Sequence, residues 1–118
     1  NRLLQSETAT TEGRTVVSNY YEALNKKDYH GAYRYLSARA MERYGTFELW
    51  EQAMTKEEVP KVKAIQLDYV SQDQDDDIVV NYMGFTVTFK DKSEPLLVRL
   101  HNEGKGWGIV AIEAAEED

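Results

Sequence analysis

The stretch VVSNYYEALNKKDYHGAYRYL, from Val16 to Leu36, predicts two short amphipathic helices joined by a tight polar link. Its first half carries apolar residues at helical spacing, which form one stripe: Val16, Val17, Tyr20, Tyr21 and Leu24. Asp28 then stands where an N-cap is needed, and the second helix would bury Tyr29, Ala32, Tyr33 and Leu36. Two such stripes need a common partner surface, so the stretch predicts a packed domain.

The rest of the chain supplies that surface. Gly45 and Thr46 open a third amphipathic segment, with Phe47, Trp50 and Met54 on one face, after a loop over 37–44. Beyond Pro60 the apolar period changes to alternation, which predicts strands over 65–69, 78–89, 96–100 and 107–114. We therefore expect an α+β fold: three N-terminal helices packed on the concave face of a curved antiparallel four-stranded sheet.

A bend is expected in the longest strand. Apolar residues change phase between Tyr82 and Met83, and Gly84 tolerates the backbone angles of a bulge. The residues expected to be mostly buried are Val16, Tyr20, Leu24, Tyr33, Leu36, Trp50, Leu67, Phe85, Leu100 and Ile109.

Length and composition limit the class of protein. The chain has 118 residues, enough for one domain, which we place at 13–115 between a flexible lead-in or tether (1–12) and an acidic tail (116–118). Its formal charge of −7 argues against a nucleic-acid partner, because phosphates need a basic surface. The absence of cysteine excludes disulfides and thiolate chemistry. No apolar run approaches the ~20 residues that span a bilayer, so membrane attachment would require a tether.

The helix pattern VVSNYYEALNKKDYHGAYRYLS and the ending Gly106-Trp107-Gly108-Ile109 resemble the nuclear transport factor 2-like superfamily, also called cystatin-like. The resemblance covers about residues 14 to 114. It implies a cone-shaped domain that commonly dimerises through the outer face of its sheet. Among these proteins the chain looks most like small exported bacterial domains and lipoproteins of unassigned function, which implies an extracytoplasmic, tethered or secreted protein.

The same superfamily contains ketosteroid isomerase, and the resemblance places Tyr20 where that enzyme has its oxyanion tyrosine. The match ends there. The strand position that should supply a protonated acid falls near Leu97 or Val98, and the loop over 37–44 offers only Glu42 as a carboxylate. A tyrosine without a base or a second donor does not stabilise an enolate sufficiently, so we favour a protein without enzymatic activity.

Aromatic residues are the best candidates for a binding site, because a tyrosine can bury its ring while its hydroxyl meets a ligand. Core packing is the expected role of Tyr21, Tyr29 and Tyr33. The residues expected to line a cavity in the cone are Tyr20, Trp50, Tyr69, Tyr82 and Phe85. The same aromatics would equally serve a protein-facing sheet, so the partner is either a small apolar ligand or a protein.

No cofactor or metal site is predicted. Asp73, Asp75 and Asp77 have the alternate spacing of a calcium loop, but the glycine and the closing glutamate of such a loop are missing, so we expect an exposed hairpin. His30 and His101 are far apart and are expected to be surface or locally bonded residues.

The leading hypothesis is a non-enzymatic binding or assembly module of the bacterial cell envelope. The alternative is a small enzyme or carrier for an apolar ligand held in the cone, with an incomplete isomerase-like site. Two or more polar groups that converge on one point of the cavity, as a catalytic site demands, would favour the alternative, and a closed, fully apolar cone would favour the structural role.

Overall fold

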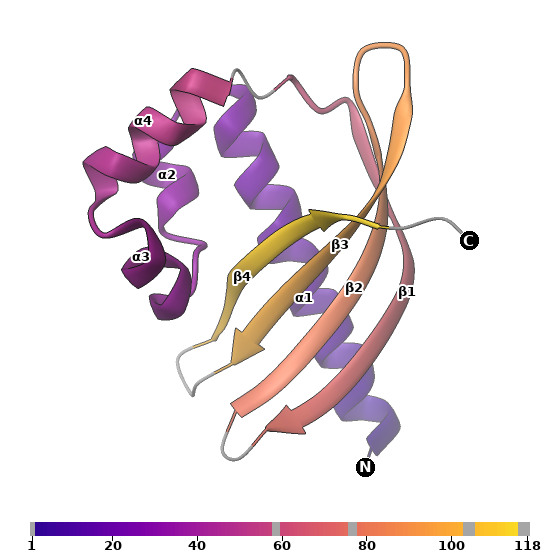
Figure 1. Ribbon diagram of the computed structural model, residues 1–118. Coiled ribbons are helices and arrows are strands. Elements are labelled where there is room, and N and C mark those ends of the chain that lie inside the picture. The colour runs from indigo at the N-terminus through magenta and orange to yellow at the C-terminus, as the bar shows by residue number, and fades with distance from the viewer. Residues whose placement is uncertain (1, 58–59, 76–77, 103–105, 116–118) are drawn as a thin grey trace.

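The computed structural model describes residues 2–57, 60–75, 78–102 and 106–115. In these ranges the chain forms four helices followed by four strands (Figure 1). The helices are α1 (Arg2–Asn25), α2 (Tyr29–Tyr33), α3 (Ala38–Tyr44) and α4 (Phe47–Glu57), and the strands are β1 (Ala64–Asp75), β2 (Ile78–Thr88), β3 (Ser93–Asn102) and β4 (Trp107–Ala114). The coarse prediction of an α+β fold is confirmed. The acidic tail, the turn residues 76–77 and most of the turn over 103–106 lie outside the described residues.

The first helix is longer than expected. We predicted a flexible lead-in up to residue 12, but α1 begins at Arg2. No proline interrupts the stretch, and Gly13, the first residue of the expected domain, lies inside the helix. Gly13 is buried because α1 comes close to the sheet there: a Cβ at this position would lie 2.7 Å from the Met83 sulfur. The glycine therefore serves close packing rather than helix termination.

The capping prediction for α2 is confirmed, and one predicted loop is wrong. The Asp28 side chain accepts a hydrogen bond from the Gly31 N–H at 3.0 Å. The segment over 37–44, expected as a loop, contains α3, whose N-cap Ser37 accepts from the Ala40 N–H at 3.1 Å. The helix was not predicted because most of its residues are charged or polar. The Ser37 cap and the burial of Ala40 stabilise it.

The sheet is a curved antiparallel meander in the order β1-β2-β3-β4. The bulge expected in the long strand lies instead on its neighbour. Leu67 pairs with Phe85 and Tyr69 with Gly84, so Asp68 is the extra residue on β1. As a result Tyr69 leaves the face shared by Ile65 and Leu67, and its ring lies over Gly84, where no Cβ would fit.

The core lies between α1 and the helix-facing side of the sheet. Six of the ten predicted core residues are buried: Tyr20, Leu36, Trp50, Phe85, Leu100 and Ile109. The other four are partly buried against the same cluster: Val16, Leu24, Tyr33 and Leu67. The list of ten omitted Met83, Val87 and Val98, and also Val17, which the apolar stripe did include; these four residues have no exposed surface.

The chain segment between α2 and α3 attaches the helical end of the molecule to β4. Ile109 N–H donates to the Tyr35 carbonyl at 2.8 Å, and Ser37 N–H donates to the Ile109 carbonyl at 2.9 Å. Leu36 thereby forms a parallel bridge with Ile109. Gly108 permits this contact, since a Cβ there would lie 2.7 Å from the Ser37 Cα. This attachment places α3 beside the strand edge and so defines one wall of the cavity described next.

Candidate functional site

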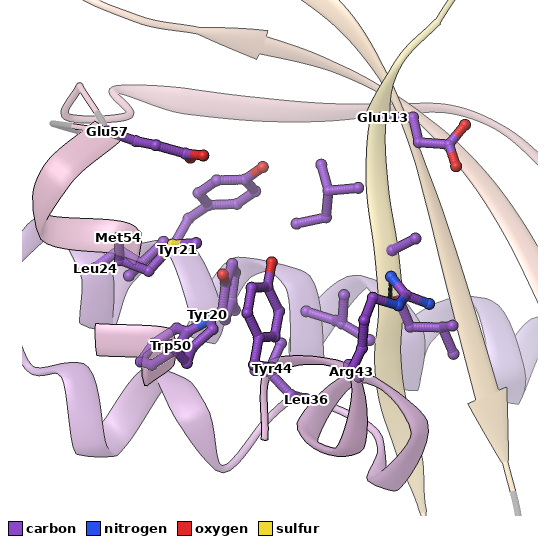
Figure 2. A pocket seen from close by; sticks show the side chains of 15 residues that line it. Tyr20, Tyr21, Leu24, Leu36, Arg43, Tyr44, Trp50, Met54, Glu57 and Glu113 are labelled. Carbon is purple, nitrogen blue, oxygen red and sulfur yellow. Dashed lines mark hydrogen bonds between the residues drawn. The ribbon is translucent and has the colours of Figure 1, made fainter. Parts of the chain in front are cut away.

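A cavity of about 430 Å³ opens between the C-terminal half of α1, the helices α3 and α4, and strand β4 (Figure 2). Its walls combine apolar and polar side chains. They come from Tyr20, Tyr21, Leu24, Leu36, Ala40, Arg43, Tyr44, Trp50, Met54, Glu57 and residues 109–113. This volume falls in the range of ~300–1,000 Å³ that is usual for small-molecule sites.

Trp50 makes one wall rigid. Its side chain is fully buried, and its ring contacts those of Tyr29, Tyr33 and Phe47 at centroid distances of 6.2, 5.2 and 6.0 Å. Such aromatic contacts fix ring orientation as well as burying area. The apolar side of the cavity is therefore preformed.

Three tyrosine hydroxyls point into the cavity, from Tyr20 and Tyr21 on α1 and from Tyr44 at the end of α3 (Figure 2). The rings of Tyr20 and Tyr21 meet edge to face, with centroids 5.5 Å apart. Both residues are buried, with 4% and 7% of their surface exposed. Among the described residues, none provides a hydrogen-bond partner for any of the three hydroxyls.

Burial raises the pKa of the two tyrosines on α1. Loss of solvation raises the pKa of Tyr21 to about 12. The pKa of Tyr20 rises further, first through burial and then through the neighbouring Tyr21, Tyr44 and Glu57. Near neutral pH both groups are uncharged and can donate a hydrogen bond to an acceptor in the cavity.

Charged side chains stand at the border of the cavity. Arg43 donates to the Val110 carbonyl at 3.4 Å, which ties α3 to β4. Glu57 lies beside the Tyr21 ring and Glu113 on the strand side (Figure 2). All three residues are exposed, so solvent reaches the rim while the tyrosines occupy the interior.

The structure brings together only two of the five predicted cavity residues, Tyr20 and Trp50. Phe85 is fully buried in the core between α1 and the sheet. Tyr82 points to the opposite face of the sheet, because it alternates with the buried Met83. The Asp68 bulge moves Tyr69 to that face as well, where it is 53% exposed.

Sequence reasoning missed the other polar residues of the site. Tyr44 was missed together with α3, although the Ser37 cap and the spacing of Ala40, Met41 and Tyr44 could have indicated it. Tyr21 was assigned to the core alone. Glu42, the carboxylate singled out beforehand, is exposed and does not line the cavity. Nothing in the local pattern of Glu57 or Glu113 indicated that the fold would bring them to one site.

The remaining candidates do not form a site. His30 is exposed and its ring stacks on Phe47 at 4.0 Å. His101 is buried in β3 rather than lying at the surface. Asp73 is exposed, and the residues at 76–77 are not described. Within the described ranges no group of three or more His, Asp or Glu side chains is placed to hold a metal ion.

Comparison with known proteins gives no relative. No protein-family model matches the chain, and neither the curated proteins nor the solved structures contain a significant match. A search of the described helices for one that is both long and apolar enough to cross a bilayer finds none.

Proposed function

We propose that this domain is a binding module without enzymatic activity, and that its cavity holds a small molecule with an apolar body and a hydrogen-bond acceptor. The observation that carries the proposal is the set of three tyrosine hydroxyls directed into a preformed, half-apolar cavity. None of these hydroxyl oxygens is among the buried side-chain atoms that lack a partner, so water reaches them when no ligand is bound. A ligand acceptor would replace that water and take the hydrogen bonds in its place.

The chemistry of the walls favours a neutral acceptor, such as a carbonyl, at the tyrosines. Uncharged phenols donate without adding charge. The rim carries two carboxylates, Glu57 and Glu113, and one cation, Arg43, so its net charge is negative. The apolar body would lie against Trp50, where aromatic packing keeps the wall in place.

Catalysis is the second candidate, and Glu57 is the observation that favours it. A carboxylate beside hydroxyl donors is the minimum set for removing a proton next to a carbonyl. Glu57 is exposed, however, and the cavity does not exclude water from it. Binding therefore has the stronger support.

We further infer that the fold is the cone-shaped nuclear transport factor 2-like fold. Support comes from the order of elements, helices first and a four-stranded meander second, and from a cavity at one end of a curved sheet. The bacterial cell envelope as location and dimerisation through the outer sheet face are proposals that rest on the sequence resemblance alone.

The test uses prodan, a neutral naphthyl ketone whose fluorescence reports both apolar surroundings and hydrogen bonding to its carbonyl. We expect saturable binding with a blue-shifted emission. Tyr44→Phe should weaken binding about five- to tenfold, the equivalent of one hydrogen bond of ~1 kcal/mol. The matched control is Tyr69→Phe, which removes a hydroxyl from the opposite face and should leave the Kd unchanged.

Three results would contradict the proposal: no saturable binding, an equal Kd for the wild type and Tyr44→Phe, or an equal loss in both variants. Glu57→Gln separates the two candidate functions. It should retain prodan binding, and a chemical conversion of a bound ketone that Glu57→Gln abolishes would establish the enzyme instead.

A further inference from the structure

A second cavity of about 420 Å³ is lined by residues from the C-terminal ends of α1 and α4 and from the segments that follow them. It shares Leu24 and Met54 with the tyrosine cavity, so the two cavities adjoin at these side chains. The rest of its lining has a different chemistry. Lys27 and Lys61 are its charged residues, and Tyr29 and Thr55 add hydroxyls.

The described residues that line this second cavity carry positive charge, whereas the chain as a whole is negative. The chain carries −7 overall, yet no Asp or Glu is found among the described residues that line the cavity. Lys26 and Lys92 form ion pairs with Glu22 and Glu94. Lys27 and Lys61 have no such pair with any residue that the structure describes. Two lysines without a counter-ion among the described residues favour an anion.

Asn25 joins the two backbone segments that carry the lysines, whose side chains are exposed. Its side chain donates to the Val62 carbonyl at 2.8 Å and accepts from the Val62 N–H at 2.9 Å. This reciprocal pair holds the segment that carries Lys61 against the end of α1. Lys27 follows Asn25 by two residues, so both lysines belong to one anchored corner of the molecule.

Lys27 occupies a backbone position that favours glycine. Its φ is +59°, in the left-handed region, where the Lys27 N–H bonds to the Leu24 carbonyl and the Asp28 N–H to the Ala23 carbonyl. This is the usual end of a helix with glycine at the left-handed residue. A lysine there strains the backbone, and an ammonium group needed at the cavity would account for it.

We propose that the second cavity binds the anionic group, carboxylate or phosphate, of an amphipathic small molecule. Its apolar chain lies along Leu24 and Met54 toward the tyrosine cavity. The inference rests on the proposed function, because it adds an anionic end to the ligand whose acceptor meets the tyrosines. It also limits the ligand class to organic anions with an apolar chain.

The test compares octanoate with octanol, which has the same chain without the charge, by calorimetry on the whole chain. We expect octanoate to bind at least tenfold more tightly than octanol. Lys27→Gly should weaken octanoate about tenfold while raising the midpoint of thermal unfolding by about 3 °C, because glycine relieves the left-handed strain. Lys61→Ala should weaken octanoate similarly. Lys26→Ala, which removes a paired lysine next to the site, should change the affinity less than twofold.

Equal binding of octanoate and octanol would overturn the inference, as would an unchanged octanoate Kd in Lys27→Gly. An equal loss in Lys26→Ala would overturn it too, since it would indicate a general effect of net charge. Prodan distinguishes the two proposals. If prodan binds the wild type and Lys27→Gly alike while octanoate fails the test, only the anion site is wrong. If neither probe binds, both proposals are wrong.

Discussion

The helix α1 serves two regions of opposite character. Val17 faces the sheet core, where Met83, Phe85, Val87 and Val98 have almost no exposed surface. Within one turn, Tyr20 and Tyr21 face a cavity of about 430 Å³ that the protein leaves unfilled. The first region is closed by side chains from α1, β2 and β3. The second is bounded by α1, α3, α4 and β4, whose side chains do not fill the space between them.

The packed region contributes most to the stability of the domain, and the cavity contributes less. Filled cores gain free energy from burial and dispersion, whereas a cavity lined by polar groups forgoes both. Natural proteins accept such losses where a ligand binds. We therefore expect substitutions in the packed region to change stability most, and substitutions in the hollow region to change binding most.

The largest effect is expected from Phe85→Ala. Phe85 is 1% exposed, and its removal would leave a cavity in the tightly packed region, at a cost of about 3–5 kcal/mol in the free energy of unfolding. Urea denaturation measures the change. Leu49→Ala, at an exposed position on α4, is the control and should stay within ~0.5 kcal/mol. A cost below ~1 kcal/mol for Phe85→Ala would mean that the two regions do not differ in packing.

A second prediction compares two glycines with equally close neighbours. At Gly108 a Cβ would lie 2.7 Å from the Ser37 Cα, and at Gly13 a Cβ would lie 2.7 Å from the Met83 sulfur. Backbone cannot move as a flexible side chain can, so Gly108→Ala should cost about 1–3 kcal/mol. Gly13→Ala should change the free energy of unfolding by less than ~1 kcal/mol. The higher helix propensity of alanine should offset the cost of moving the Met83 side chain.

Thermal or urea unfolding of both alanine variants decides this prediction. Gly108 joins β4 to the segment before α3, so Gly108→Ala should also impair prodan binding, whereas Gly13→Ala should not. If Gly108→Ala had wild-type stability, β4 and the segment before α3 would be less tightly packed than the two hydrogen bonds of Ile109 indicate.

The packed region was more accessible to sequence reasoning than the hollow one. Alternation in β2 and helical spacing in α1 and α4 follow burial directly, so Tyr20, Trp50 and Phe85 were correctly expected in or near the core. The Asp68 bulge interrupted that record, and the alternation Leu67, Tyr69 then placed Tyr69 on the wrong face. A bulge depends on pairing with the neighbouring strand, which a single stretch of sequence does not contain.

The cavity depends on tertiary contacts throughout. Tyr44 reaches it because Ser37 binds β4 and orients α3, and Glu57 reaches it because α4 ends there. Neither fact leaves a periodic signal. Lys27 is similar: its sequence neighbours suggest a solvated link and its side chain is exposed, but only the fold brings it and Lys61 to one cavity.

A third prediction concerns pH. The pKa of Tyr21 is raised from 10.0 to about 12 in the folded protein, so between these values the folded state keeps a proton that the unfolded state loses. The stability due to this group is fully present below pH ~10 and is lost as pH rises toward ~12, by at most ~1.4 kcal/mol per pH unit. Tyr21→Phe removes this loss.

The measurement is the difference in unfolding free energy between wild type and Tyr21→Phe from pH 8 to 12, which cancels the titration of the lysines. The wild type should lose stability relative to the variant above pH 10. A constant difference would show that the Tyr21 hydroxyl is solvated in the cavity. The hollow region would then extend deeper than the burial of this residue indicates.

The smallest effect on stability is expected from Tyr20→Phe. The Tyr20 hydroxyl has no hydrogen-bond partner among the described residues, so its removal should change the free energy of unfolding by no more than about 1 kcal/mol. We also expect the wild-type domain neither to isomerise ketosteroid-like substrates nor to hydrolyse simple esters, because Glu57 and Glu113, the two carboxylates among the described cavity walls, are both exposed to solvent. Spectrophotometric assays of both reactions test this.

If the wild type turned over a ketosteroid and Tyr20→Phe slowed it about a hundredfold, the loss typical of an oxyanion donor, the hollow region would be an active site. Glu57 would then be the base to examine, since Glu42 does not line the cavity.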